Sequence, residues 1–206
     1  MQFTQFLLVA FCLYGQVFSQ FVASKFYDTS SGITYASITI TGVAYRVALP
    51  PLNSPNPDAI IQIVSPTKNG WCGFSWGGRM LRSPLSIAWA TKQTSGQQAI
   101  IGNWMATAYA RPSPYSGASH TPIAISPSKT NGTHWTATAR CIGCTKWDTT
   151  DLTTKSGETR FAYACSTTAP TNPSSNTSSF SVHDSPGSWL HDLNIARNSS
   201  FSNWIA

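Results

Sequence analysis

The chain has 206 residues, a length typical of one domain, and only 10% of them are charged. Its formal net charge is +6, but the basic residues are scattered from Lys25 to Arg197 and form no run, which argues against a nucleic-acid-binding segment. The charge leaves two interpretations open: a mildly basic soluble surface, or a surface that favours an acidic partner or an anionic ligand.

The first residues are typical of a secretory signal peptide. An uncharged start is followed by an apolar run from Phe6 to Tyr14 and then by small and polar residues. This run is too short to span a bilayer comfortably, and no other stretch is long and apolar enough for a membrane helix. We therefore expect residues 1–19 to be removed, residues 20–206 to form one domain, and the mature protein to be extracellular.

Removal of the signal leaves four cysteines, and an even number in a secreted chain favours disulfides. The Cys-x-x-Cys of Cys141 and Cys144 favours a small structural disulfide in this compartment over a redox or metal site. Cys72 and Cys165 then pair by elimination, and both lie in apolar strand-like segments, as inter-sheet bridges often do. Three Asn-x-Ser/Thr glycosylation acceptors fit the same compartment: Asn131, Asn176 and Asn198.

The segments after the signal are typical of an all-β domain. Short stretches of β-branched and aromatic residues alternate with clusters of Gly, Pro, Asn and Ser, which predicts a sandwich or a barrel. No stretch shows a strong helical period. The tract 167–179 is expected to be a polar loop, and residues 184–187 a turn. The expected strand-forming segments are 32–50, 59–66, 71–76, 85–91, 98–110, 133–141 and 159–166.

Residue types argue against several hydrolase chemistries. The seven acidic residues form no evident carboxylate pair for glycoside hydrolysis, and no Gly-x-Ser-x-Gly elbow is present. The four histidines show no His-Glu-x-x-His spacing, so they do not predict a zinc site of that kind.

The eight tryptophans allow two interpretations. Exposed tryptophan and tyrosine rings would form a sugar-stacking platform and make the protein a carbohydrate-binding module, whereas buried rings would build the core. Trp71, Trp89 and Trp135 lie in strand-like runs, so these three are expected in the core.

A methionine and a histidine stand where strand-like segments meet turns. Met80 follows Gly77 and Gly78, and His183 follows an alternating Phe-Ser-Val. A thioether and an imidazole together suit a low-spin haem iron and raise its reduction potential. A histidine at the end of a strand is usually structural, so residue types alone make this a weak hypothesis.

The order of several longer motifs is more specific. In these motifs the chain resembles the haem b cytochrome domain of the fungal cellobiose dehydrogenases, often called an iron reductase domain, over nearly all of the mature chain. The resemblance implies an antiparallel, immunoglobulin-like β-sandwich with non-covalent haem b in a pocket at one end. The motifs are FYDTSSGITY (26–35), ALPPL (48–52), GWCGFSWGGRM (70–80), NWMATAYARPSPYSG (103–117), THWTATARCIGCTKW (133–147) and HDSPGSWLHDLNIARNSSFSNW (183–204).

The family motif also assigns ligands. The axial methionine falls on Met80 and the axial histidine on His183, whereas Met105 and His191 do not match the ligand positions. The two glycines before Met80 would let the backbone turn tightly and approach the macrocycle closely. Arg79, beside Met80, is expected to be solvated.

The resemblance further places three aromatic residues near the cofactor. Tyr109 falls at the position of a tyrosine beside a haem propionate, to which a phenol can donate a hydrogen bond. Trp89 and Tyr115 fall at positions of family aromatics near the pocket.

Two protein axial ligands leave the iron no open site, so the resemblance implies electron transfer and argues against an oxygenase or a peroxidase. The sequence holds no Gly-x-Gly-x-x-Gly and has no room for the flavin domain of the parent family, so sugar oxidation is not carried over. We expect a free-standing, monomeric, secreted cytochrome that takes electrons from an extracellular flavin dehydrogenase. The expected acceptors are copper polysaccharide monooxygenases, ferric complexes or quinones; nucleic acid and membranes are not expected partners. The alternative is a haem-free carbohydrate-binding module.

Overall fold

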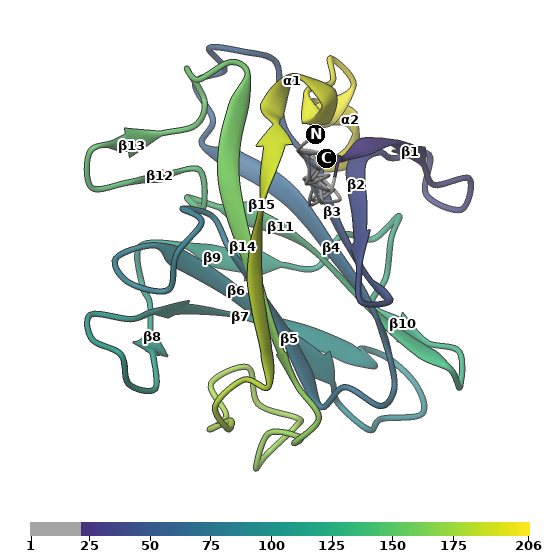
Figure 1. The fold of residues 1–206 in the computed structure, drawn as a ribbon. Helices are drawn as coiled ribbons and strands as arrows, with labels where there is room; N and C mark the ends of the chain where they lie inside the picture. The colour runs from purple at the N-terminus through teal and green to yellow at the C-terminus, as the bar shows by residue number, and fades with distance from the viewer. Residues whose placement is uncertain (1–21) are drawn as a thin grey trace, which may run out of the picture.

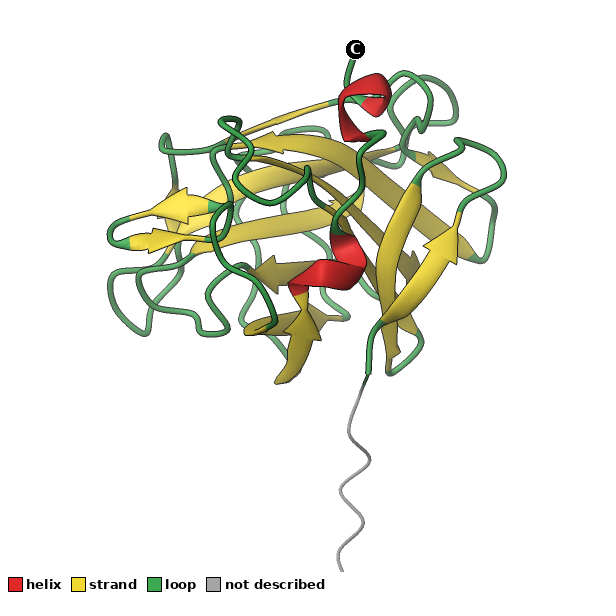
Figure 2. Ribbon diagram, turned by 90° about the horizontal axis from the view of Figure 1, so that it is seen from above, coloured by secondary structure: helices red, strands yellow, loops and turns green. Residues whose placement is uncertain are grey.

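The computed structural model describes residues 22–206, so the predicted signal lies outside the described residues. Two antiparallel sheets pack face to face as a β-sandwich of immunoglobulin-like architecture, with long connecting loops (Figures 1 and 2). The first sheet has the order β1-β2-β3-β4-β11-β10, and β9 also pairs with β11. Its strands are β1 (Ser24–Tyr27), β2 (Thr34–Ile40), β3 (Val43–Ala48), β4 (Asp58–Pro66), β9 (Ser119–Thr121), β10 (Lys129–Thr130) and β11 (His134–Ile142).

The second sheet has the order β15-β14-β5-β6-β7-β8, and β12 and β13 form a separate two-stranded hairpin. The strands are β5 (Trp71–Ser75), β6 (Pro84–Ala90), β7 (Ala99–Met105), β8 (Ser113–Pro114), β12 (Lys146–Trp147), β13 (Thr150–Asp151), β14 (Glu158–Ser166) and β15 (Ser185–Asp192). Two single-turn helices end the chain, α1 (Leu193–Ala196) and α2 (Phe201–Trp204). No helix within residues 22–206 has the length and apolar character needed to cross a bilayer.

The strand periodicity explains how the sheets pack. Alternate residues of a strand point to opposite faces, so Cys72 and Phe74 of β5 face the first sheet while Trp71, Gly73 and Ser75 face outward. The inward set joins the main core cluster, and the outward set belongs to a second apolar surface on the far side of the sheet. The second sheet is therefore apolar on both faces, which is unusual for an antiparallel sheet with one face in water.

The core contains all of the tryptophans. Each of the eight indoles is at most 9% exposed, which confirms the prediction for Trp71, Trp89 and Trp135. The sugar-stacking platform of the carbohydrate-binding alternative therefore has no exposed tryptophan to build it. The buried tryptophans are Trp71, Trp76, Trp89, Trp104, Trp135, Trp147, Trp189 and Trp204.

Two local predictions were wrong. The segment 32–50 is two strands, because Thr41 and Gly42 turn the chain with φ of 51° and 85°. The expected turn at residues 184–187 is the start of β15, while the three residues before His183 are not a strand. Pro186 is tolerated there because β15 is an edge strand that pairs only with β14, so the missing N–H can face away from the sheet.

Both predicted cysteine pairs are joined in the structure. Cys72 and Cys165 are register partners on adjacent strands, with Cα atoms 4.1 Å apart. The expected inter-sheet bridge is thus wrong: this disulfide joins β5 to β14 within one sheet. The Cys141–Cys144 disulfide closes a short loop at the end of β11.

Candidate functional site

A cavity of about 570 Å³ lies over the outer face of the second sheet, within the size range of small-molecule sites. Its floor consists of small residues on two neighbouring strands: Gly73 and Ser75 of β5, and their register partners Ala164 and Ala162 of β14. A Cβ on Gly73 would lie 3.4 Å from Ile87 and 3.5 Å from Trp71. The small side chains therefore keep open a space that larger ones would fill.

The walls of the cavity are apolar. Trp71, Leu85 and Ile87 project from the same outer face and line the cavity. Phe180, from the loop before β15, packs on Trp71 and Trp104, with both pairs of ring centroids 5.0 Å apart. The aromatic contacts fix this loop against the sheet and exclude water from the wall that it forms.

Met80 enters the cavity from the turn between β5 and β6. A chain of hydrogen bonds holds this turn: the Gly77 N–H donates to Ser83 Oγ at 2.7 Å, and Ser83 Oγ lies 3.0 Å from Ser75 Oγ. The Ser75 hydroxyl in turn donates to the Arg79 carbonyl at 2.6 Å. Because Ser83 is fully buried, these bonds are shielded from competition with water and fix the residue next to Met80.

The two glycines of this turn also approach other parts of the protein closely. Gly78 has φ of +71°, and a Cβ there would lie 2.7 Å from the Arg160 carbonyl oxygen of β14. A Cβ on Gly77 would lie 2.5 Å from Ser83 Oγ. Neither glycine lines the cavity, so the close approach that they allow is to β14 and to the turn itself. The predicted tight turn is present, whereas the approach of these glycines to a macrocycle stays a prediction.

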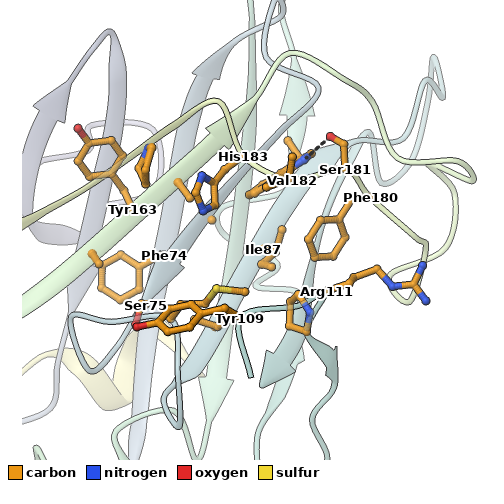
Figure 3. A pocket seen from close by; sticks show the side chains of 18 of the residues that line it. Phe74, Ser75, Ile87, Tyr109, Arg111, Tyr163, Phe180, Ser181, Val182 and His183 are labelled. Carbon is orange, nitrogen blue, oxygen red and sulfur yellow. Dashed lines mark hydrogen bonds between the residues drawn. The ribbon is translucent and has the colours of Figure 1, made fainter. Parts of the chain in front are cut away.

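His183 lies in the cavity wall between two anchored neighbours (Figure 3). On one side, Ser181 Oγ accepts from Trp71 Nε1 at 3.5 Å and lies 3.1 Å from Ser166 Oγ. On the other side, the Asp184 N–H donates to the Cys165 carbonyl at 2.8 Å. The residues that flank the imidazole are thereby tied to β5 and β14.

The Asp184 side chain strengthens this anchor. Its carboxylate accepts from the Thr167 N–H at 2.8 Å and from the Ser166 hydroxyl at 3.0 Å. These bonds, the Thr167 N–H first, lower the pKa of the Asp184 carboxyl from its ordinary value, because they favour the charged form.

Met80 and His183 approach the cavity from opposite ends of β5. Met80 follows the end of the strand at Ser75. His183 lies two residues before Ser185, the β15 partner of Cys165, and Cys165 pairs with Cys72 near the beginning of β5. β5 has five residues, so its two ends are about 13 Å apart. The resemblance implied a pocket at one end of the sandwich; the structure places the cavity over the outer face, between turns from both ends of a strand.

The other predicted cofactor residues divide into two groups. Tyr109 lines the cavity and is 87% exposed, so its ring borders the mouth (Figure 3). Trp89 does not line it: the indole is buried behind Phe180 and donates to the Pro173 carbonyl at 3.0 Å. Tyr115 packs against the main core and does not line the cavity either.

Met105 and His191 do not line the cavity, in agreement with the family motif, in which neither falls at a ligand position. His191 is 1% exposed on the inward face, beside Phe161 and Trp189. Burial lowers its pKa to about 4, so the imidazole is neutral at pH 7.

Sequence reasoning missed the wall residue Phe180 and the rim residue Arg111, both of which line the cavity. The alternating Phe-Ser-Val before His183 was the available signal for Phe180.

Sequence reasoning also missed the position of His120, which places a ring nitrogen within 4.8 Å of both sulfurs of the Cys141–Cys144 pair. Both sulfurs are joined in a disulfide, so within residues 22–206 this group offers no pair of thiolates to a metal.

The predicted glycosylation acceptors are unevenly accessible. Asn131 and Asn176 are exposed, and Asn198 is half-buried. Their glycosylation stays a prediction.

Comparison with known proteins identifies the family. The family model of the cytochrome domain of cellobiose dehydrogenase matches residues 26–203. A pyrroloquinoline quinone-dependent pyranose dehydrogenase from Coprinopsis cinerea is 30% identical over 189 residues, which are 88% of this chain but 25% of that protein. The chain therefore spans about a quarter of the length of the curated relatives that it matches.

Two solved structures have the same fold. The cytochrome b domain of pyranose dehydrogenase from Coprinopsis cinerea matches with a TM-score of 0.79 and 28% identity, over 89% of this chain and 94% of that one. The cytochrome domain of Myriococcum thermophilum cellobiose dehydrogenase matches with a TM-score of 0.77 and 27% identity, over 89% and 95% of the two chains. With its cavity, its antiparallel sandwich and a family match over most of its length, the chain belongs to the family of cellobiose dehydrogenase cytochrome domains.

Proposed function

We propose that the chain is a b-type cytochrome that binds haem non-covalently in this cavity and transfers single electrons. One observation carries the proposal: Met80 and His183 are 103 residues apart in the sequence, yet both line one apolar cavity and reach it from opposite ends of β5. Two axial ligands must bind opposite faces of a flat macrocycle, and this approach suits that requirement.

The residues of the cavity fit haem in three respects. The floor of glycine, serine and alanine leaves room for a flat group, and the walls are largely aromatic and aliphatic. A thioether and an imidazole form a donor set typical of electron-transfer haem. The four cysteines within residues 22–206 are all in disulfides, so none is free to attach the group covalently.

Haem iron would supply the one-electron chemistry, and the protein residues set its conditions. Met80 and His183 would occupy both axial positions and keep oxygen and substrate from the metal. Phe180 and Trp71 exclude water from one wall, which raises the strength of electrostatic interactions inside. The Tyr109 hydroxyl, at the exposed mouth, would donate a hydrogen bond to a propionate carboxylate.

We further propose that the protein works outside the cell, with sugar dehydrogenases as donors. The matched relative is a pyrroloquinoline quinone-dependent pyranose dehydrogenase. This supports a donor enzyme with a quinone cofactor, as an alternative to the flavin dehydrogenase expected from the sequence. Copper polysaccharide monooxygenases, ferric complexes and quinones remain the proposed acceptors. The free-standing form stays a prediction of the sequence.

Variants of the two ligands test the proposal. Met80→Leu keeps the volume of the side chain and removes the sulfur, and His183→Ala removes the imidazole. Each should abolish the six-coordinate, low-spin absorption spectrum of the reduced protein, whereas the matched variants Met105→Leu and His134→Ala should keep it. If Met80→Leu and His183→Ala retain the spectrum of the parent protein, the assignment of the axial ligands is wrong.

The carbohydrate-binding alternative has less structural support than the cytochrome. A sugar platform needs exposed aromatic faces, and every tryptophan of the chain is buried, which leaves the exposed Tyr27 and Tyr109 as candidates.

A further inference from the structure

We propose that Trp147 is a positioning residue for the axial ligand Met80 and acts through Gly77; this inference rests on the proposed electron-transfer function. Trp147 lies on the β12–β13 hairpin, which pairs with neither large sheet (Figure 1). The hairpin comes late in the chain, yet its indole packs on the turn between β5 and β6 that carries Met80.

The contact between the hairpin and the turn is at Gly77. A Cβ there would lie 3.0 Å from Trp147 Cζ2 and 2.5 Å from Ser83 Oγ, which also accepts from the Gly77 N–H at 2.7 Å. Only a residue without a side chain lets the indole come this close to the backbone. The Gly77 backbone is therefore held by a hydrogen bond and by an aromatic ring from a remote segment.

The indole is itself fixed in the core. Trp147 is 7% exposed and belongs to the main core cluster, together with Trp76, the residue before Gly77. A buried side chain of this size makes many van der Waals contacts in a close-packed interior. The ring therefore has little freedom to move away from the turn.

The base of the hairpin is anchored independently of the turn. The buried Thr145 hydroxyl donates to a carbonyl of the loop before β4 at 2.6 Å. The Leu152 N–H donates to the Thr145 carbonyl at 2.8 Å and closes the hairpin. The Cys141–Cys144 disulfide joins the start of the hairpin to β11. The position of Trp147 is thus set by the first sheet, and the turn packs against it.

Each of the three residues before Met80 is then held by a different element. Trp147 packs on Gly77, and β14 packs on Gly78. A hydroxyl of β5 holds the Arg79 carbonyl. A loop that is already ordered loses less entropy when one of its side chains binds. Removal of the indole should free the turn and increase the fraction of time that the Met80 sulfur is away from the metal.

Binding of imidazole to the ferric protein tests the proposal. An added ligand can take the position of Met80 only after the sulfur has left it, so the limiting rate at high imidazole reports this release. Trp147→Leu should raise the limiting rate about three- to thirtyfold. Trp147→Phe keeps an aromatic ring and should raise it less than about threefold. The matched control is Trp204→Leu, a tryptophan that is 9% exposed in a separate core cluster; it should leave the rate unchanged within about twofold.

A second variant keeps the test decisive if Trp147→Leu does not fold. Thr145→Val removes the hydrogen bond at the base of the hairpin and keeps the indole. This variant should raise the limiting rate about two- to tenfold. An unchanged rate in the variants that fold would overturn the role of Trp147.

Amide hydrogen exchange of residues 77–80 measures the freedom of the turn without any need for haem. Trp147→Leu should accelerate exchange of the Gly77 amide, and Trp204→Leu should not. Equal acceleration in both variants would report a general loss of stability and overturn the proposal. Faster local exchange in a protein that binds no haem would uphold the contact between the hairpin and the turn but refute the cytochrome function. A low-spin spectrum with unchanged imidazole binding and unchanged exchange in Trp147→Leu would do the reverse.

Discussion

Gly78 is the residue of the Met80 turn whose replacement has the most predictable cost. Its φ of +71° lies in the left-handed region, and a Cβ would meet the carbonyl oxygen of Arg160 at 2.7 Å and its Cβ at 2.8 Å. Arg160 belongs to β14, which pairs with β15 on one side, so its backbone has little freedom to retreat. The conformational cost for alanine is about 1–2 kcal/mol, and the overpacking adds about 1–3 kcal/mol.

The chain offers a matched control for the first of these two contributions. Gly96 has φ of +70°, and a Cβ there would meet nothing within 4 Å. Gly96→Ala should therefore cost only the conformational part, about 1–2 kcal/mol of the free energy of unfolding. Gly78→Ala should cost about 2–5 kcal/mol in all. Urea denaturation with intact disulfides measures both, and loss of the low-spin spectrum in Gly78→Ala would report displacement of Met80. Equal costs for the two variants would refute the packing of this turn against β14.

Three other predictions follow from the same structure. Ser83→Ala removes the acceptor of the Gly77 N–H and should cost about 1–3 kcal/mol in urea denaturation, whereas the exposed Ser174→Ala should be near neutral. Loss of the Cys72–Cys165 disulfide, which spans 93 residues, should lower the free energy of unfolding by about 4–5 kcal/mol. Loss of Cys141–Cys144, which spans 3 residues, should lower it by about 2 kcal/mol. Urea denaturation of the two double Cys→Ala variants tests this order. Burial lowers the pKa of His191 to about 4, so between pH 6.5 and 4 the unfolded chain binds a proton that the folded chain does not. The free energy of unfolding should therefore decrease as the pH is lowered from 6.5 to 4, by up to about 1.4 kcal/mol per pH unit. His191→Gln, but not His134→Gln, should reduce this slope.

The sandwich and most of its core could be predicted from residue patterns. Alternation of apolar residues between Gly- and Pro-rich turns identified most of the long strands, and the burial of Trp71, Trp89 and Trp135 followed from their places in these runs. Alternation shows which residues share a face, but it does not show which face meets the other sheet. For that reason the sequence alone could not place Gly73 and Ala164 on the floor of an outward-facing cavity.

The position of the site depended on strand order, which the sequence does not display. Met80 and His183 reach the same cavity because β15, β14 and β5 are neighbours in the sheet, although eight strands, β6 to β13, lie between β5 and β14 in the sequence. The same strand order decides that the Cys72–Cys165 disulfide lies within a sheet. The family resemblance supplied the ligand pair, but it also suggested Trp89 and Tyr115, which the packing of Phe180 and of the core keeps away from the cavity.

The most direct test of the account is the absorption spectrum of the purified protein, oxidised and then reduced with dithionite, together with a pyridine haemochrome assay. A cytochrome with Met80 and His183 as axial ligands predicts a sharp Soret band that shifts on reduction, resolved α and β bands, and extractable haem b. Folded protein that was produced with ample haem and shows no Soret band would contradict the electron-transfer function.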